Sequence, residues 1–197
     1  MPARVPWPQQ GFLRRWEGKA QELRRILGLG DEDSLDPLEL IEKMPGVLVA
    51  SVVEIGNGTG SLLDCLRRAR NSWWAAAYRE TGGPWLIVYN PWQSDTRLRS
   101  SLMEEVAHIH LNHKPTRVFP DPATGLLTRD YGISKEKEAY GVAAAALVPF
   151  VGLVRQLARG EPDASIARHY GVSPALLRYR TNTTRARHRA AHTPARS

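Results

Sequence analysis

The segment that most constrains the fold runs from Arg97 to His113, "RLRSSLMEEVAHIHLNH". Its apolar residues fall on nearly every side of a helix, yet its centre carries Glu104, Glu105 and His108. On a helix, residues four apart project from one face, so Glu104 and His108 can converge while Glu105 lies about 100° round the axis. Because buried charge is costly unless it is paired, this cluster needs a structural or chemical explanation.

The spacing of the cluster is close to H-E-x-x-H, in which two histidines hold zinc and the glutamate between them acts as general base. Here the string is E-E-V-A-H, so a carboxylate, Glu104, stands at the first ligand position. Such a string alone is weak, because charged helix residues commonly face solvent and pair locally, in this case with Arg99 or His108.

The rest of the chain predicts a mixture of helices and short strands. Gly46 to Glu54 is rich in β-branched residues, and two apolar runs separated by residues 80–83 indicate a hairpin, "SWWAAAYRETGGPWLIVYN". Helical patterns cover residues 14–27, 61–70, 97–113, 135–148 and 151–159, and a further short helix is expected to begin at Pro37, with Asp36 as its N-cap. Near the C-terminus, "ASIARHYGVSPALLRYR" has a break at Gly171, Ser173 as N-cap and Pro174 at the first helical position, which is a helix-turn-helix outline.

Positive charge is concentrated at one end of the chain. The formal net charge is +7, and after Asp163 there are seven arginines and no acid, so residues 1–163 sum to zero. We expect residues 183–197 to be a basic, disordered tail. With one cysteine, Cys65, and no apolar stretch at the N-terminus, a cytoplasmic location without a membrane partner is expected.

The order "LIVYNP…RLRSSLMEEVAHIHLNHKP" followed by "EKEAYGVAAAALVP" resembles the ImmA/IrrE family of metallo-endopeptidases. The likeness lies in a strand that ends in Asn, an Arg-containing lead-in, a metal helix and a later E-A-x-x-x-A helix that closes on L-x-P. It implies an α+β, zincin-like domain at residues 12–150 with a small antiparallel or mixed sheet. A helical extension at residues 151–182 and the tail at 183–197 would follow.

Carried over position by position, the resemblance implies that Glu105 is the catalytic glutamate and that Glu104, His108 and Glu138 are the metal ligands. Glu136 is the less favoured choice on the later helix. The expected cofactor is Zn²⁺, or Mn²⁺ or another divalent metal, and two carboxylates would leave the ion a weaker Lewis acid. We expect His110 and His113 not to be ligands, and Tyr131 and Tyr140 receive no role.

The resemblance implies a metal-dependent endopeptidase that cleaves a specific protein, a helix-turn-helix transcriptional repressor, with the substrate added as a strand at an edge of the hairpin. Two alternatives remain open. The chain could be an inactive, partner-binding member of the fold, or a DNA-binding regulator that uses Ser173, Arg178 and Arg180, with the C-terminal arginines contacting nucleic acid.

Overall fold

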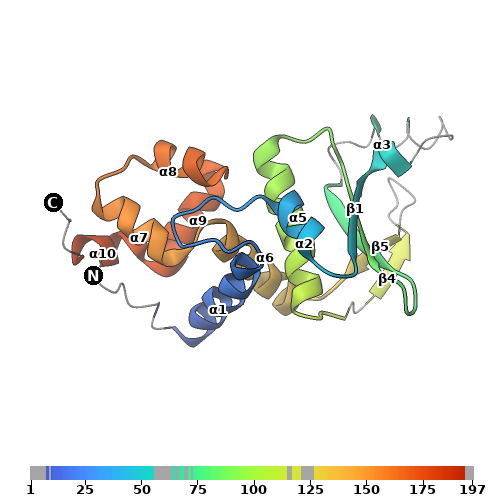
Figure 1. Ribbon diagram of the computed structural model, residues 1–197, viewed down its shortest axis with the longest axis horizontal. Helices are drawn as coiled ribbons and strands as arrows, with labels where there is room; N and C mark the ends of the chain where they lie inside the picture. Colours follow the sequence, from blue (N-terminus) through green and yellow to red (C-terminus); the bar gives the residue numbers. More distant parts are fainter. Residues whose placement is uncertain are drawn as a thin grey trace. The chain divides into compact units, whose positions relative to one another are not determined.

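In the computed structural model (Figure 1), the described residues are 8, 10–55, 64, 67–68, 71, 73–114, 117–120 and 127–193. The helix expected at residues 61–70 therefore lies mostly outside the described residues. The chain divides into two compact units, one made of residues 1–36 and 141–197 and the other of residues 37–140. This division differs from the boundary that the sequence suggested after residue 150, because the N-terminal helix groups with the C-terminal helices.

The unit of residues 37–140 contains a small sheet and the helices that cover it. Its elements are α2 (Pro37–Lys43), β1 (Val47–Ser51), α3 (Val52–Ile55), β2 (Ala75–Arg79), β3 (Trp85–Tyr89), α5 (Asp95–His110), β4 (Arg117–Pro120), β5 (Leu127–Asp130) and the first half of α6 (Ile133–Leu147). Helix α5 packs along β2, β3 and α2, and its buried side chains include Leu102, Met103 and Val106.

The main sheet is mixed, with the strand order β1-β3-β2. Strand β1 runs parallel to β3, with Val49 opposite Ile87, and β2 runs antiparallel to β3, with Ala77 opposite Ile87. The expected hairpin is therefore confirmed, and Gly82 in its turn has a φ of 79°, which glycine adopts readily. Strands β4 and β5 form a separate antiparallel pair.

The unit built from both ends of the chain is helical. It contains α1 (Gly11–Ile26), the second half of α6, α7 (Phe150–Ala158), α8 (Asp163–Tyr170), α9 (Pro174–Thr184) and α10 (Ala186–Ala191). Two glycines allow close packing within this unit. A Cβ at Gly141 would lie 2.4 Å from the Trp16 ring, and a Cβ at Gly152 would lie 2.0 Å from the Asp31 carbonyl oxygen. Any larger residue at these positions would force neighbouring elements apart.

Three charged side chains lie in the core of this helical unit, and each forms an ion pair or hydrogen bonds, although the Nε of Arg24 has no hydrogen-bond partner among the described residues. Arg180 is 1% exposed; it forms an ion pair with Glu17 and donates from Nε to the Val148 carbonyl at 3.0 Å. Glu17 also accepts the Phe150 backbone N–H at 3.1 Å. Arg24 donates to the carbonyls of Ala146, Gly30 and Asp33, and burial lowers its pKa.

The expected disordered tail is wrong over much of its length. Residues 186–191 form α10, which packs on α7, and Ala186 and Ala190 are buried. These alanines are four residues apart, so they lie on one face of the helix and provide a small apolar contact. Residues 194–197 lie outside the described part of the chain.

The predicted α+β class, with a small mixed sheet and a helical extension, is confirmed. Within the described residues, no single helix has the length and apolar character to cross a membrane. The pair α6 and α7, bent by 50°, passes that test only on combined length and composition.

Candidate functional site

Helix α5 carries the E-E-V-A-H string in its second half and ends two residues after His108. Asn112 then adopts a left-handed conformation with a φ of 51°, and the His113 N–H donates to the His108 carbonyl at 3.0 Å. This turn brings the His113 ring back to the His108 ring, with 3.2 Å between their Nδ1 atoms. The local chain path therefore pairs two imidazoles that sequence analysis treated separately.

Glu105 is held against the edge of the main sheet. Its Oε2 accepts the Ala77 backbone N–H of β2 at 2.9 Å. The Asn90 N–H donates to the Trp74 carbonyl at 2.9 Å, which sets the alternation of hydrogen-bonded pairs between β2 and β3. By this alternation, the N–H and C=O groups of Ala75, Ala77 and Arg79 point away from β3. Glu105 thus lies at the outer edge of β2, where an added strand would bind.

His108 is buried and neutral at physiological pH. Only 3% of it is exposed, and Tyr131 stacks on its ring with centroids 3.9 Å apart and an angle of 26° between the planes. Burial first, and then the charges of His113 and Lys135, lower the pKa of His108 to about 4. Its Nε2 atom lies 3.4 Å from Oε2 of Glu136. Because the imidazole is neutral, this contact is not an ion pair at neutral pH.

Glu104 is in an unfavourable electrostatic environment for a carboxylate. Burial first, and then the negative charge of Glu136, raise its pKa to about 7, against the opposing effect of Arg97. Two acids and a neutral imidazole therefore occupy one region of this unit. That donor chemistry suits a divalent cation, which would relieve the repulsion between the two carboxylates.

A line of side chains links two carboxylates through two imidazoles. Glu136 lies near Nε2 of His108, the two Nδ1 atoms face each other, and Nε2 of His113 lies 3.4 Å from Oε2 of Glu138. Burial lowers the pKa of His113 as well, despite the opposing effect of Glu138. Three contacts need three hydrogens, but two neutral imidazoles carry two. One contact therefore lacks its hydrogen unless a further proton or a cation binds.

The structure places the expected ligands in two groups. Glu136 lies near both Glu104 and His108, whereas Glu138 approaches His113 instead of His108. Across the described residues, no group of three or more His, Cys, Asp or Glu side chains is already arranged to hold a metal ion. The donor types fit a divalent cation, but the described side chains do not form a ready-made site.

The fold and this helix define a metallopeptidase-like class of protein: a mixed sheet whose edge lies beside a helix that carries an acid-rich variant of the zinc motif. The peptidase family described as the IrrE N-terminal-like domain matches residues 67–182. Since this match covers more than half of the chain, the chain belongs to that family. No curated protein matches the chain.

The residues proposed to contact DNA have different environments. The α8-turn-α9 outline is present, with Gly171 in a left-handed conformation, and Ser173 caps α9 by accepting the Leu176 N–H at 3.2 Å. The prediction for Arg180 is wrong, because its guanidinium is buried on Glu17. Arg178 is exposed, so its contact with DNA stays a prediction.

Three neighbours of His108 in the structure, Tyr131, His113 and Glu136, lie outside the ligand set that the resemblance implies. The five-residue spacing from His108 to His113 was the available signal, because it spans a helix end and a tight turn. Whether Glu136 or Glu138 reaches His108 depends on the rotation of α6, which spacing within α6 does not determine.

Proposed function

We propose that this chain is a metal-dependent endopeptidase that acts on a specific protein, with a helix-turn-helix transcriptional repressor as the substrate class. The substrate class rests on the family resemblance. The observation that carries the proposed chemistry is the line of contacts from Glu136 through His108 and His113 to Glu138, in which two neutral imidazoles supply two N–H groups for three contacts. A divalent cation beside Nε2 of His108 would supply the positive charge that this line lacks.

The residues that would hold the cation are His108, Glu104 and one acid of α6, for which the contacts favour Glu136 over Glu138. When bound, a metal such as Zn²⁺ would polarise the scissile carbonyl and lower the pKa of water. His108 would use Nε2 as a neutral donor. If its Nδ1–H donates to His113, and His113 donates from Nε2 to Glu138, the required tautomer of His108 is selected.

Glu105 would move the protons of the reaction. Its carboxylate takes a proton from the attacking water and delivers it to the amine nitrogen as the C–N bond breaks, so one water and one peptide bond give a carboxylic acid and an amine. The outward groups of Ala75 and Arg79 would pair with an extended substrate backbone. Glu105 holds the Ala77 N–H between them, so the general base lies along the proposed path of the substrate strand.

Metal binding is tested by Zn²⁺ titration of protein purified without a metal-binding tag. His108→Ala should abolish binding, and Glu136→Gln should weaken it at least about tenfold. Glu138→Gln is the matched control on the same helix and should have a smaller effect. If Glu138→Gln weakens binding more than Glu136→Gln does, Glu138 is the α6 ligand; unchanged Zn²⁺ binding in His108→Ala contradicts the proposed site.

Peptidase activity is tested by incubating Zn²⁺-loaded protein with a library of unstructured peptides and sequencing the new termini. Glu105→Gln is the control, because it keeps the side-chain size and removes the proton acceptor. New termini with the unsubstituted protein and none with the variant support the proposal. Identical products from both proteins contradict the role of Glu105.

An inactive binding protein of the same fold is the second candidate. It is favoured by the absence, among the described residues, of a ready-made group of three metal donors. In that case Glu105 would serve to close the edge of β2 by accepting the Ala77 N–H, and no Zn²⁺ dependence would be found. DNA binding through Arg178 is the third candidate, and the burial of Arg180 weakens it.

A further inference from the structure

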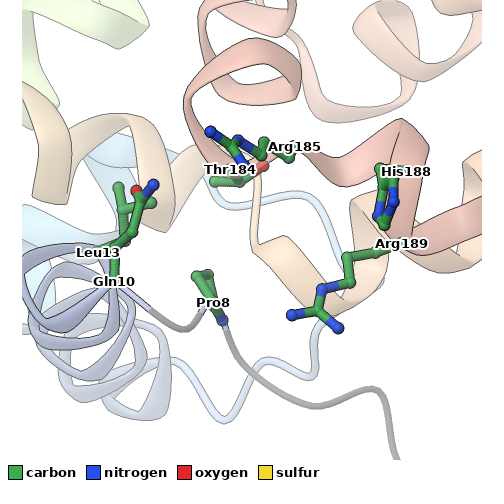
Figure 2. Close-up of a pocket in the computed structure, with 7 residues that line it drawn as sticks. All are labelled: Pro8, Gln10, Leu13, Thr184, Arg185, His188 and Arg189. Atoms are coloured by element: carbon green, nitrogen blue, oxygen red, sulfur yellow. The ribbon is translucent and has the colours of Figure 1, made fainter.

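A second site lies in the helical unit, remote in sequence from the α5 motif. A cavity of about 370 Å³ is lined by residues of the N-terminal segment and of the α9–α10 junction (Figure 2). The lining residues are Pro8, Gln10, Leu13, Thr184, Arg185, His188 and Arg189. Figure 2 shows Gln10 and Leu13 on one side of the cavity, His188 and Arg189 on the other, and Arg185 beside Thr184 between them.

The three basic side chains that line the cavity come from α10 and from the residue before it. His188 and Arg189 are adjacent residues of α10, and Arg185 is the residue that immediately precedes this helix. No acid is among the lining residues. The neighbouring Arg187 is neutralised by Asp163, with nitrogen–oxygen distances of 2.6 and 2.5 Å. In the part of the chain that the structure describes, the guanidinium groups of Arg185 and Arg189 have no such carboxylate partner.

Arg185 occupies a backbone conformation that costs free energy for an arginine. It has a φ of 55° and a ψ of 37° at the junction between α9 and α10, where glycine is the usual residue. This left-handed residue separates the two helices and places its guanidinium at the cavity. A strained non-glycine residue at a cavity mouth is a common sign of a binding role, because glycine would satisfy the backbone alone.

We propose that this cavity binds a phosphate-bearing small molecule. Arg185 and Arg189 provide planar groups of donors that match phosphate oxygens, and His188 and the Gln10 amide add further donor atoms. Pro8 and Leu13 are the apolar members of the lining and would contact the organic part of the ligand. A volume of about 370 Å³ is within the usual range for small-molecule sites and exceeds the space of one phosphate group.

The shape of the site favours a small ligand over duplex DNA. Duplex phosphates are contacted by side chains and helix ends that protrude from a protein surface. Here the arginines instead line a concavity whose other wall comes from Gln10 and Leu13. The cavity contains none of Ser173, Arg178 and Arg180, the residues expected to contact DNA.

Isothermal titration calorimetry of the full chain at low salt tests the proposal, with adenosine 5′-monophosphate as probe and adenosine as its phosphate-free control. We expect the monophosphate to bind and adenosine to bind at least about tenfold more weakly. Arg189→Ala should weaken binding of the monophosphate by about tenfold or more. Arg178→Ala removes the same charge from an exposed position outside the cavity and should leave the affinity within about twofold.

Arg185→Gly separates ligand binding from folding. Glycine accepts the left-handed backbone, so thermal stability should be retained or raised while binding of the monophosphate falls by about tenfold. Equal losses in Arg189→Ala and Arg178→Ala would overturn the proposal in favour of general charge attraction. Absence of binding at millimolar monophosphate would also overturn it, as would tighter binding of a DNA duplex that Arg185→Gly and Arg189→Ala abolish.

Discussion

The two compact units both bury charged side chains, but they treat the charge in opposite ways. In the helical unit, Glu17 and Arg180 form a buried ion pair whose remaining atoms bind the backbone. In the other unit, Glu104 lies near the like charge of Glu136, and the buried His108 is neutral. The first arrangement is complete without a ligand, whereas in the second the charge of Arg97 does not offset the effects of burial and of Glu136 on Glu104. Buried charge therefore points to a functional site where its surroundings leave the pKa strongly shifted.

The largest expected change in stability comes from breaking the buried ion pair between Glu17 and Arg180. Glu17→Gln keeps the shape of the side chain and leaves the Arg180 guanidinium buried without its counterion. It should lower the free energy of unfolding by about 3 kcal/mol, as measured by urea denaturation.

The matched control is Glu32→Gln, because Glu32 pairs with Arg155 and Arg159 in a more exposed position. Solvent screens that pair, so the loss should stay below about 1 kcal/mol. Equal losses at Glu17 and Glu32 would contradict the distinction between buried and exposed pairs.

Removing the charge of Glu104 should raise the free energy of unfolding, whereas Glu17→Gln should lower it. The folded-state pKa of Glu104 is raised to about 7, so the metal-free folded protein holds this proton more tightly than the unfolded chain does. Below the pKa that Glu104 has in the unfolded chain, this carboxyl does not lower the free energy of unfolding. As pH rises from there towards about 7, the carboxyl lowers the free energy of unfolding progressively. At pH 8, Glu104→Gln in chelator-treated protein should raise the free energy of unfolding by about 1 to 3 kcal/mol.

The same variant should gain little at pH 4, where Glu104 is protonated in both states. Urea denaturation of the two proteins at pH 4 and pH 8 measures this difference. A gain that does not change with pH would mean that Glu104→Gln acts through packing and not through charge.

The smallest expected change in stability concerns the stacking of Tyr131 on the neutral imidazole of His108. Tyr131 stacks on His108, so Tyr131→Leu should remove an aromatic contact worth about 1 kcal/mol of unfolding free energy. Tyr78→Leu, at a side chain that is 43% exposed, should cost less than about 0.5 kcal/mol. If the two variants lose the same stability, stacking on His108 contributes nothing specific.

Local sequence patterns predicted the elements well, and the family resemblance predicted their class. The helix expected at residues 97–113 is α5, and the hairpin turn lies where Gly82 permits it. The identity of buried charges was harder to predict. Arg180 was considered as a DNA contact, whereas it is buried on Glu17, which is 163 residues away in the sequence. The same difficulty affects Glu136 and Glu138, whose partners depend on how α6 is rotated.

The tail shows a different limit of sequence reasoning. Arginines and alanines after residue 183 suggested disorder by composition, yet Ala186 and Ala190 pack α10 on α7. Two small apolar contacts are too weak a pattern to detect in a biased sequence. The surface that α10 contacts belongs to α7, residues 150–158. The sequence pattern within the tail therefore gives no sign of its partner.

Because the helical unit combines residues 1–36 with residues 141–197, the order of synthesis separates its two parts. Glu17 leaves the ribosome 163 residues before Arg180, which corresponds to about 10 to 30 s of translation. During that interval, the whole of residues 37–140 has emerged and is free to fold. The N-terminal helix is therefore synthesised well before the partners of its apolar face and of the Glu17 carboxylate, so folding of this unit depends on the last residues of the chain to be made.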